Sequence, residues 1–234
     1  MQKVFKYLFF LTILAISCEK KPDVGGTQNE TGELRIVWET PQEVVGAGGG
    51  YPRVHRLNDG RLMMTFSKSF NGYALFSEDD GKTWPESSLT NPMSKFTASN
   101  ENGKALLSVA VPDFAQLSEN HPHHPNRIIF AGNYRPRTTD GKTTGITTVH
   151  PYTISISVSD DNGKSWSPTR HLYMSGIWDE NVTIGCWEPF VLELPDGTVQ
   201  IYFADETPYY RLGSRWHNIS VIESKDGGDN WEEV

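Results

Sequence analysis

The chain repeats one short pattern, Ser-x-Asp-x-Gly-x-x-Trp, at residues 77–84, 159–166 and 224–231. Each copy follows a short strand-like run, at 73–76, 154–158 and 219–222. In such a turn the Asp carboxylate accepts backbone N–H groups, Gly adopts positive φ, and Trp supplies a large apolar anchor. The pattern therefore predicts three strand-ending turns with one geometry. The repeated residues are Ser77, Asp79, Gly81, Trp84, Ser159, Asp161, Gly163, Trp166, Ser224, Asp226, Gly228 and Trp231.

A longer repeat precedes the turns. Residues 54–67 and 190–203 both read as strand, Asp-Gly turn and strand, a strong hairpin signal. The middle copy, 113–132, has a His/Pro-rich turn instead. We interpret this turn, with His121, His123 and His124, as an exposed loop and not as a metal site. The repeats predict an all-β chain built from small sheets arranged radially, as in a β-propeller.

The first residues have the pattern of a signal peptide. Lys3 and Lys6 precede an apolar run at 7–16, and Ser17 and Cys18 follow it. The segment 1–18 resembles a bacterial lipoprotein signal, which implies that Cys18 is lipidated; an ordinary secretory signal is the alternative. Residues 19–34 are polar and Gly-containing, so we expect a flexible tether before a folded region at 35–234. The expected location is the bacterial cell envelope, lipid-anchored at the outer membrane or cell surface.

Charge and cysteine content narrow the choice of partners. The net charge is −8 and there is no basic run, which argues against nucleic acid as a partner. The lipid anchor is the expected membrane contact. The other cysteine, Cys186, lies between Gly185 and Trp187 and is expected to be a buried apolar residue.

The repeated turn resembles the Asp box, or BNR repeat, of sialidases and related glycosidases. The resemblance implies a six-bladed β-propeller, of which about three repeats are present, so we expect the N-terminal part of such a domain. In that family the boxes lie on the rim, which implies a structural role. A calcium loop is the rival interpretation, but aligning Gly163 with the loop glycine puts Val158 and Thr169 at ligand positions.

The resemblance places a substrate pocket where the innermost strands meet. Arg53 stands where sialidase-like enzymes carry the first arginine of their substrate cluster, and a guanidinium there can bind a sugar carboxylate or hydroxyls. A structural salt bridge is the alternative role for Arg53, and Arg56 is the alternative arginine. Arg135, which follows the strand at 128–131, is a second candidate for substrate binding, with a solvated loop residue as the alternative.

Glu188 is the candidate catalytic residue. The run Trp187-Glu188-Pro189-Phe190 resembles the exo-arabinanase relatives of sialidases, in which a glutamate of this blade is the acid/base. Apolar neighbours favour the protonated carboxyl that a general acid needs. The alternative role is a structural carboxylate paired with an arginine.

Further substrate contacts are expected next to these residues. Trp187 is a further candidate for substrate binding, and Asp205 and Glu206 follow the next strand, where carboxylates could hold sugar hydroxyls. Tyr209 and Tyr210 come shortly after and could stack on a ring face, and loop solvation is the alternative for all four of these later residues. A glycosidase needs two groups across the scissile bond. In the relatives the second group comes from later blades.

The sequence thus predicts a secreted, lipid-anchored, exo-acting glycoside hydrolase of the sialidase or exo-arabinanase type. Its partner is an oligosaccharide or glycoconjugate, and no cofactor or metal is expected. The alternative is a non-catalytic cell-surface propeller that binds glycans or proteins.

Overall fold

The computed structural model describes residues 40, 44, 49–138, 149–175, 184–210, 212–214 and 216–234. Contacts divide the chain into two units, Met1–Glu43 and Val44–Val234, and every sheet belongs to the second unit. The predicted signal peptide with Cys18, and the predicted tether at 19–34, lie outside the described residues.

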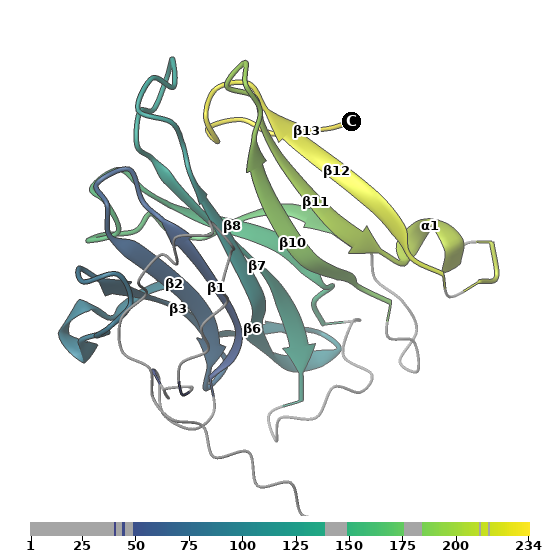
Figure 1. Cartoon of the computed structure of the whole chain (residues 1–234). Coiled ribbons are helices and arrows are strands. Elements are labelled where there is room, and N and C mark those ends of the chain that lie inside the picture. Colours follow the sequence, from purple (N-terminus) through teal and green to yellow (C-terminus); the bar gives the residue numbers. More distant parts are fainter. Residues whose placement is uncertain are drawn as a thin grey trace, which may run out of the picture. The chain divides into compact units, whose positions relative to one another are not determined.

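Three antiparallel sheets, here called blades 1 to 3, hold the regular structure (Figure 1). Blade 1 contains β1 Gly50–Arg56, β2 Leu62–Lys68, β3 Asn71–Ser77 and β4 Thr90–Met93. Blade 2 contains β5 Phe96–Asn100, β6 Gly103–Gln116, β7 Ile128–Arg137, β8 Thr153–Ser159 and β9 Arg170–Met174. Blade 3 contains β10 Cys186–Glu193, β11 Val199–Asp205, β12 Asn218–Ser224 and β13 Glu232–Glu233. Helical structure among the described residues is limited to η1 Glu86–Ser88 and α1 Thr207–Tyr210.

The predicted hairpins are present at the predicted places. The Asp-Gly turns join β1 to β2 and β10 to β11, and both turn glycines have positive φ, 90° at Gly60 and 85° at Gly197. Blade 2 differs by one strand, because β5 pairs with the first part of β6 through a turn at Gly103. This hairpin was not predicted.

Apolar side chains fill the two spaces between neighbouring blades. One cluster joins blades 1 and 2 and includes Met63, Phe76 and Phe130. The other joins blades 2 and 3 and includes Ile129 and Phe203. The first long strand of each blade, β1, β6 or β10, lies beside its counterpart, with β6 in contact with both of the others (Figure 1).

The three boxes share one hydrogen-bond scheme. In the second box Ser159 Oγ donates to Asp161 Oδ1 (2.7 Å), and the Gly163 N–H donates to Ser159 Oγ (2.8 Å). Ser165 donates to both Asp161 oxygens, through its N–H (2.8 Å) and its hydroxyl (2.5 Å). These bonds from Ser165, with the one from Ser159, lower the pKa of Asp161 to about 2. Thr83 acts in the same way on Asp79 in the first box, and Asn230 on Asp226 in the third.

The box tryptophan of one blade packs against the preceding blade. Trp166 lies edge-on to Phe130 and donates its indole N–H to Thr90 Oγ1 of blade 1 (3.0 Å). Trp231 packs against the cluster between blades 2 and 3. These contacts are of the kind expected of an apolar anchor between blades.

An arginine in front of the second long strand of a blade bonds to the next blade's box loop. Arg61, before β2, donates to the carbonyl oxygen of Asn162 (3.0 Å), the residue preceding the box glycine. Arg127, before β7, donates to the carbonyl oxygen of Gly227 (3.1 Å), the equivalent residue of the third box. The match is supported by the turn bonds Leu57 N–H to Arg61 O and Leu117 N–H to Arg127 O.

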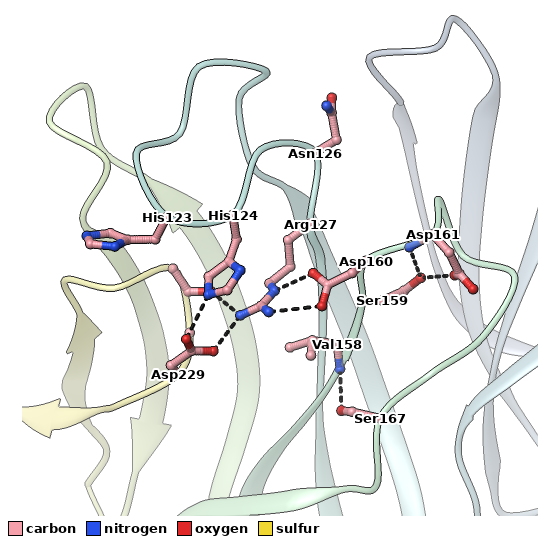
Figure 2. A network of polar contacts seen from close by, with 12 residues as sticks. His123, His124, Asn126, Arg127, Val158, Ser159, Asp160, Asp161, Ser167 and Asp229 are labelled. Atoms are coloured by element: carbon pink, nitrogen blue, oxygen red, sulfur yellow. Dashed lines mark hydrogen bonds and ion pairs between the residues drawn. The ribbon is translucent and has the colours of Figure 1, made fainter.

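Arg127 also holds two carboxylates (Figure 2). Its Nε and Nη2 donate to the two oxygens of Asp160 (2.6 and 2.9 Å), and its Nη1 donates to Asp229 Oδ1 (2.6 Å). His124 Nε2 lies 2.7 Å from the other Asp229 oxygen. The guanidinium is buried and both carboxylates are half-exposed, so blades 2 and 3 share a partly solvated ion cluster at this end.

The sequence suggested that the His/Pro-rich turn is an exposed loop, but part of this turn is buried. His121 is 2 % exposed. Its Nδ1 accepts the N–H groups of His123 and His124 (3.3 and 3.0 Å), so Nε2 carries the proton and donates to the Gly197 carbonyl oxygen (2.9 Å). The turn is ordered by long-range contacts with blade 3, which local composition does not reveal.

Candidate active site

The first long strand of each blade contains the same backbone irregularity. Tyr51, Val111 and Glu188 have φ of 54°, 42° and 54°, and each precedes a proline. Each lies where the register of its strand pair shifts, between Gly50 and Arg53, Ala110 and Asp113, and Trp187 and Phe190. Left-handed backbone is costly for residues with a Cβ, by about 1–2 kcal/mol, and proline restricts the preceding residue further. Such strain is concentrated at functional sites.

Glu188 presents its carboxyl from this irregularity at the start of β10. The sequence suggested that apolar neighbours enclose this side chain, but the structure shows it exposed. It lies within electrostatic range of Arg135, a residue of β7 in blade 2. Glu188 and Arg135, two predicted site residues from different blades, are therefore coupled electrostatically.

Arg135 is held in an unusual environment for a guanidinium. Burial lowers its pKa, and its Nε is buried without a hydrogen-bond partner. The guanidinium carbon lies 4.9 Å from the ring centre of Trp187, a cation–π contact. Tyr51 also lies within electrostatic range. An unsatisfied buried donor of this kind is costly.

Trp187 and Glu206 form a unit beside Arg135. The Trp187 indole N–H donates to Glu206 Oε2 (3.1 Å), which also accepts the Gly185 N–H (2.8 Å). His217 Nε2 lies 3.1 Å from the other Glu206 oxygen. These contacts fix the tryptophan ring, and the ring of Tyr152 packs on it with centres 4.8 Å apart. Glu206 thus positions Trp187, while its own oxygens are both occupied.

Asp205 is placed differently from the sequence-based expectation of a sugar contact. Its side chain is buried, and its Oδ2 accepts the hydroxyls of Tyr173 (2.6 Å) and Ser220 (3.2 Å). Its Oδ1 accepts the Thr207 N–H (3.0 Å). Burial, and after it the hydrogen bond to Asp205, raise the pKa of Tyr173 well above its ordinary value. These contacts are those of a structural carboxylate.

Arg53 and Arg56 lie on β1 with different partners. Arg56 Nη1 contacts Asp80 Oδ1 (2.8 Å) and donates to the Gly60 carbonyl oxygen (2.7 Å), both near the first box. Arg53 is exposed and lies within electrostatic range of Asp113 on β6. Of the two arginines, Arg53 is therefore the one beside the first long strands of the other blades.

Asp113 is a residue that sequence reasoning did not single out as functional. It is 3 % exposed, its Oδ2 accepts the Val191 N–H of β10 (2.9 Å), and its Oδ1 is buried without a hydrogen-bond partner. Burial raises its pKa. His55 Nε2 lies 4.0 Å from Oδ1. The sequence did contain a signal for Asp113. This residue follows Val111-Pro112, which occupies the same place in its repeat as Tyr51-Pro52 and Glu188-Pro189 occupy in theirs.

Two kinds of feature are missing from the part of the chain that the structure describes. No group of three or more His, Cys, Asp or Glu side chains there could hold a metal ion. No helix there is long and apolar enough to cross a membrane.

The comparisons with known proteins agree with the boxes and the three blades. The BNR/Asp-box repeat family matches residues 157–168, which contain the second box. No curated protein matches the chain. Among solved structures, the α-L-arabinofuranosidase Arb93A of Fusarium graminearum is 19 % identical, with a TM-score of 0.55 over 83 % of this chain. The Hadza microbial sialidase Hz136 is 16 % identical, with a TM-score of 0.56 over 80 % of this chain. A leech intramolecular trans-sialidase is 12 % identical, with a TM-score of 0.56 over 87 % of this chain.

The fold is that of a sialidase-type β-propeller. The prediction of an all-β, Asp-box propeller fold is thus confirmed, and the described chain supplies three of its blades. The chain spans 50 % of the arabinofuranosidase, 37 % of Hz136 and 46 % of the leech enzyme.

Proposed function

We propose that this sialidase-type propeller belongs to an exo-acting glycoside hydrolase, with Glu188 as general acid/base and with Arg135 and Trp187 binding the sugar. The observation that carries the proposal is the left-handed backbone of Glu188, which presents an exposed carboxyl beside the half-buried Arg135–Trp187 pair. Solved structures with this fold include an α-L-arabinofuranosidase bound to arabinobiose and a sialidase.

Each residue has a distinct task in this proposal. Trp187, fixed by Glu206, offers an aromatic surface to the sugar ring. The half-buried Arg135 guanidinium offers a positive charge to a substrate oxygen. Glu188 protonates the departing glycosidic oxygen, and the second group, which either takes up the sugar carbon as a nucleophile or activates the attacking water, comes from outside the described residues. Arg53 binds at the edge of the same site.

Turnover of the complete gene product tests the proposal. Glu188→Gln should reduce hydrolysis of arabinobiose or 3′-sialyllactose, whichever the wild type cleaves, by about 10²–10⁴-fold. Hydrolysis of an aryl glycoside of the same sugar should fall less in its glycosylation step, because its leaving group needs little protonation. Glu193→Gln on the same strand is the control, since Glu193 bonds to Ser118 and not to the site. Wild-type activity in Glu188→Gln would remove Glu188 from the mechanism.

A non-catalytic glycan-binding propeller is the second candidate. The observation in its favour is that internal hydrogen bonds occupy the carboxylates of Asp205 and Glu206. Of the predicted site carboxylates in the described residues, this leaves Glu188 alone to act on a substrate, and a glycosidase needs two groups. A complete gene product that binds these sugars through Arg135, yet hydrolyses none of them, would support this candidate.

We also propose that Cys18 carries a lipid that anchors the protein in the bacterial cell envelope. The apolar run at 7–16 followed by Ser17 and Cys18 supports the proposal. In the native host, Cys18→Ala should leave the membrane fraction, measured by fractionation and immunoblotting. A variant that partitions like the wild type would place the anchor elsewhere.

A further inference from the structure

A second pocket lies at the outer side of the junction between blades 1 and 2. Its volume is about 470 Å³, within the range of small-molecule sites. Residues of β4 and β5, including Asn91 and Phe96, form one wall. Trp166, at the end of the second box, and His171 of β9 form the other. None of these residues belongs to the candidate active site.

The lining of this pocket, here called the outer pocket, carries no charge. None of its ten lining residues is Asp, Glu, Lys or Arg, although these types make up 21 % of the chain. Its histidine is neutral near pH 7, because partial burial and then the neighbouring His150 lower the pKa of His171. The outer pocket therefore gives an ionic ligand no counter-charge, in contrast to the Arg135 site.

Aromatic rings and unpaired polar groups share the outer pocket. Phe96 is 37 % exposed and packs edge-on against Tyr134, with centres 5.1 Å apart. The Asn91 side chain accepts a hydrogen bond from Ser94 Oγ (3.0 Å), while its amide nitrogen donates to no described residue. His171 Nδ1 bonds to Ser155 Oγ (2.8 Å), and its Nε2 has no hydrogen-bond partner in the described structure.

We infer that the outer pocket binds a neutral sugar unit. A sugar combines apolar C–H faces, which pack on aromatic rings, with hydroxyls that both donate and accept, and the exposed ring of Phe96, the Asn91 amide and the neutral His171 match both features. This inference adds a second glycan site to the proposed function. Such a site would hold a longer or branched neutral glycan while another part of it occupies the Arg135 site.

The test measures binding to the 234-residue chain with the Arg135 site disabled by Arg135→Gln. Titrations followed by saturation-transfer NMR use arabinobiose as the neutral probe and free N-acetylneuraminic acid as the acidic probe. We expect arabinobiose to bind this variant, and the acidic sugar to bind it at least about tenfold more weakly than arabinobiose does. Adding Asn91→Ala or Phe96→Ala should weaken arabinobiose binding by about tenfold or more. Asn91 is exposed, so its variant is expected to fold, and thermal melting checks every variant.

Phe70→Ala is the matched control. Phe70 has nearly the same exposure as Phe96, 38 %, but lies on the turn between β2 and β3, outside the outer pocket. It should leave arabinobiose binding unchanged. The inference is overturned if folded Arg135→Gln protein binds no arabinobiose, if Asn91→Ala leaves binding unchanged, or if Phe70→Ala weakens it as much as Phe96→Ala. A wrong assignment of the Arg135 site would be seen in a different measurement. In that case Arg135→Gln would leave sugar binding unchanged, and Glu188→Gln would leave turnover unchanged.

Discussion

Glu188 shows how a single residue can be displayed at the expense of stability. An exposed glutamate on a regular strand needs no left-handed backbone, and a glycine would adopt this conformation without strain. The same conformation recurs at Tyr51 and Val111. The irregularity is therefore a feature of the repeat, and each blade carries a different side chain at this position. At Glu188 that side chain is an exposed carboxyl within electrostatic range of Arg135.

We predict that Glu188→Gly is more stable than Glu188→Ala by about 1 kcal/mol, because alanine retains the cost of positive φ and glycine does not. Urea unfolding of the two variants measures the difference. Leu192, further along β10 and without positive φ, is the control. There glycine should be the less stable residue by about 0.5–1 kcal/mol. An alanine variant at 188 that is as stable as the glycine variant would show that the strain is absent.

The Asp box is an element whose stability depends on a charged carboxylate. In the folded chain Asp161 accepts bonds from Ser165 and Ser159, and its pKa falls from 3.8 to about 2. A depressed folded-state pKa gives stability that is present above the unfolded value and is lost as the pH falls through the folded value. The boxes should therefore contribute fully near neutral pH and lose their contribution between about pH 4 and pH 2.

We predict that Asp161→Asn reduces the loss of stability on acidification. The urea midpoint of the wild type should fall between pH 6 and pH 3 by more than that of the variant. Glu101→Gln, which changes an exposed carboxylate in the β5–β6 turn, should keep the wild-type difference. If Asp161→Asn also keeps it, the box carboxylate does not carry the acid sensitivity.

Trp166 connects the second box to blade 1, and its replacement by alanine should destabilise the propeller by about 3 kcal/mol, as for a large aromatic deletion. Lys164→Ala in the same turn should have little effect, since this lysine is exposed. Chemical unfolding of both variants tests this difference. Equal stability of Trp166→Ala and the wild type would contradict the anchoring role.

In the whole molecule, Arg127 is the main polar connection between blades 2 and 3. Its side chain is 7 % exposed, so its removal leaves Asp160 and Asp229 without their cation. We predict that Arg127→Met destabilises the chain by about 2–3 kcal/mol, less than a fully buried pair because both carboxylates are half-exposed. Arg56→Met is the control, because Arg56 and its partner Asp80 are both exposed. This substitution should lower the free energy of unfolding by less than about 1 kcal/mol. Similar urea midpoints for the two variants would contradict the prediction.

The sequence was informative where structure depends on neighbouring residues. The boxes and the Asp-Gly hairpins were predictable because each is stabilised within a few residues, as in the bonds from Ser165 to Asp161. The pairing of β5 with β6, the burial of His121 and the position of Asp113 depend on contacts from distant segments. The same holds for the site, where Glu188 and Arg135 were named separately but their proximity is a property of the fold.

The Arg61 and Arg127 contacts give the propeller a direction. Each arginine reaches forward from one blade to the carbonyl before the box glycine of the next, so every such junction is head-to-tail. At the corresponding place before β11, blade 3 has Thr198, whose side chain is too short for this reach. A blade that follows blade 3 would therefore lack this contact, whereas any blade can accept it, because the acceptor is a backbone carbonyl.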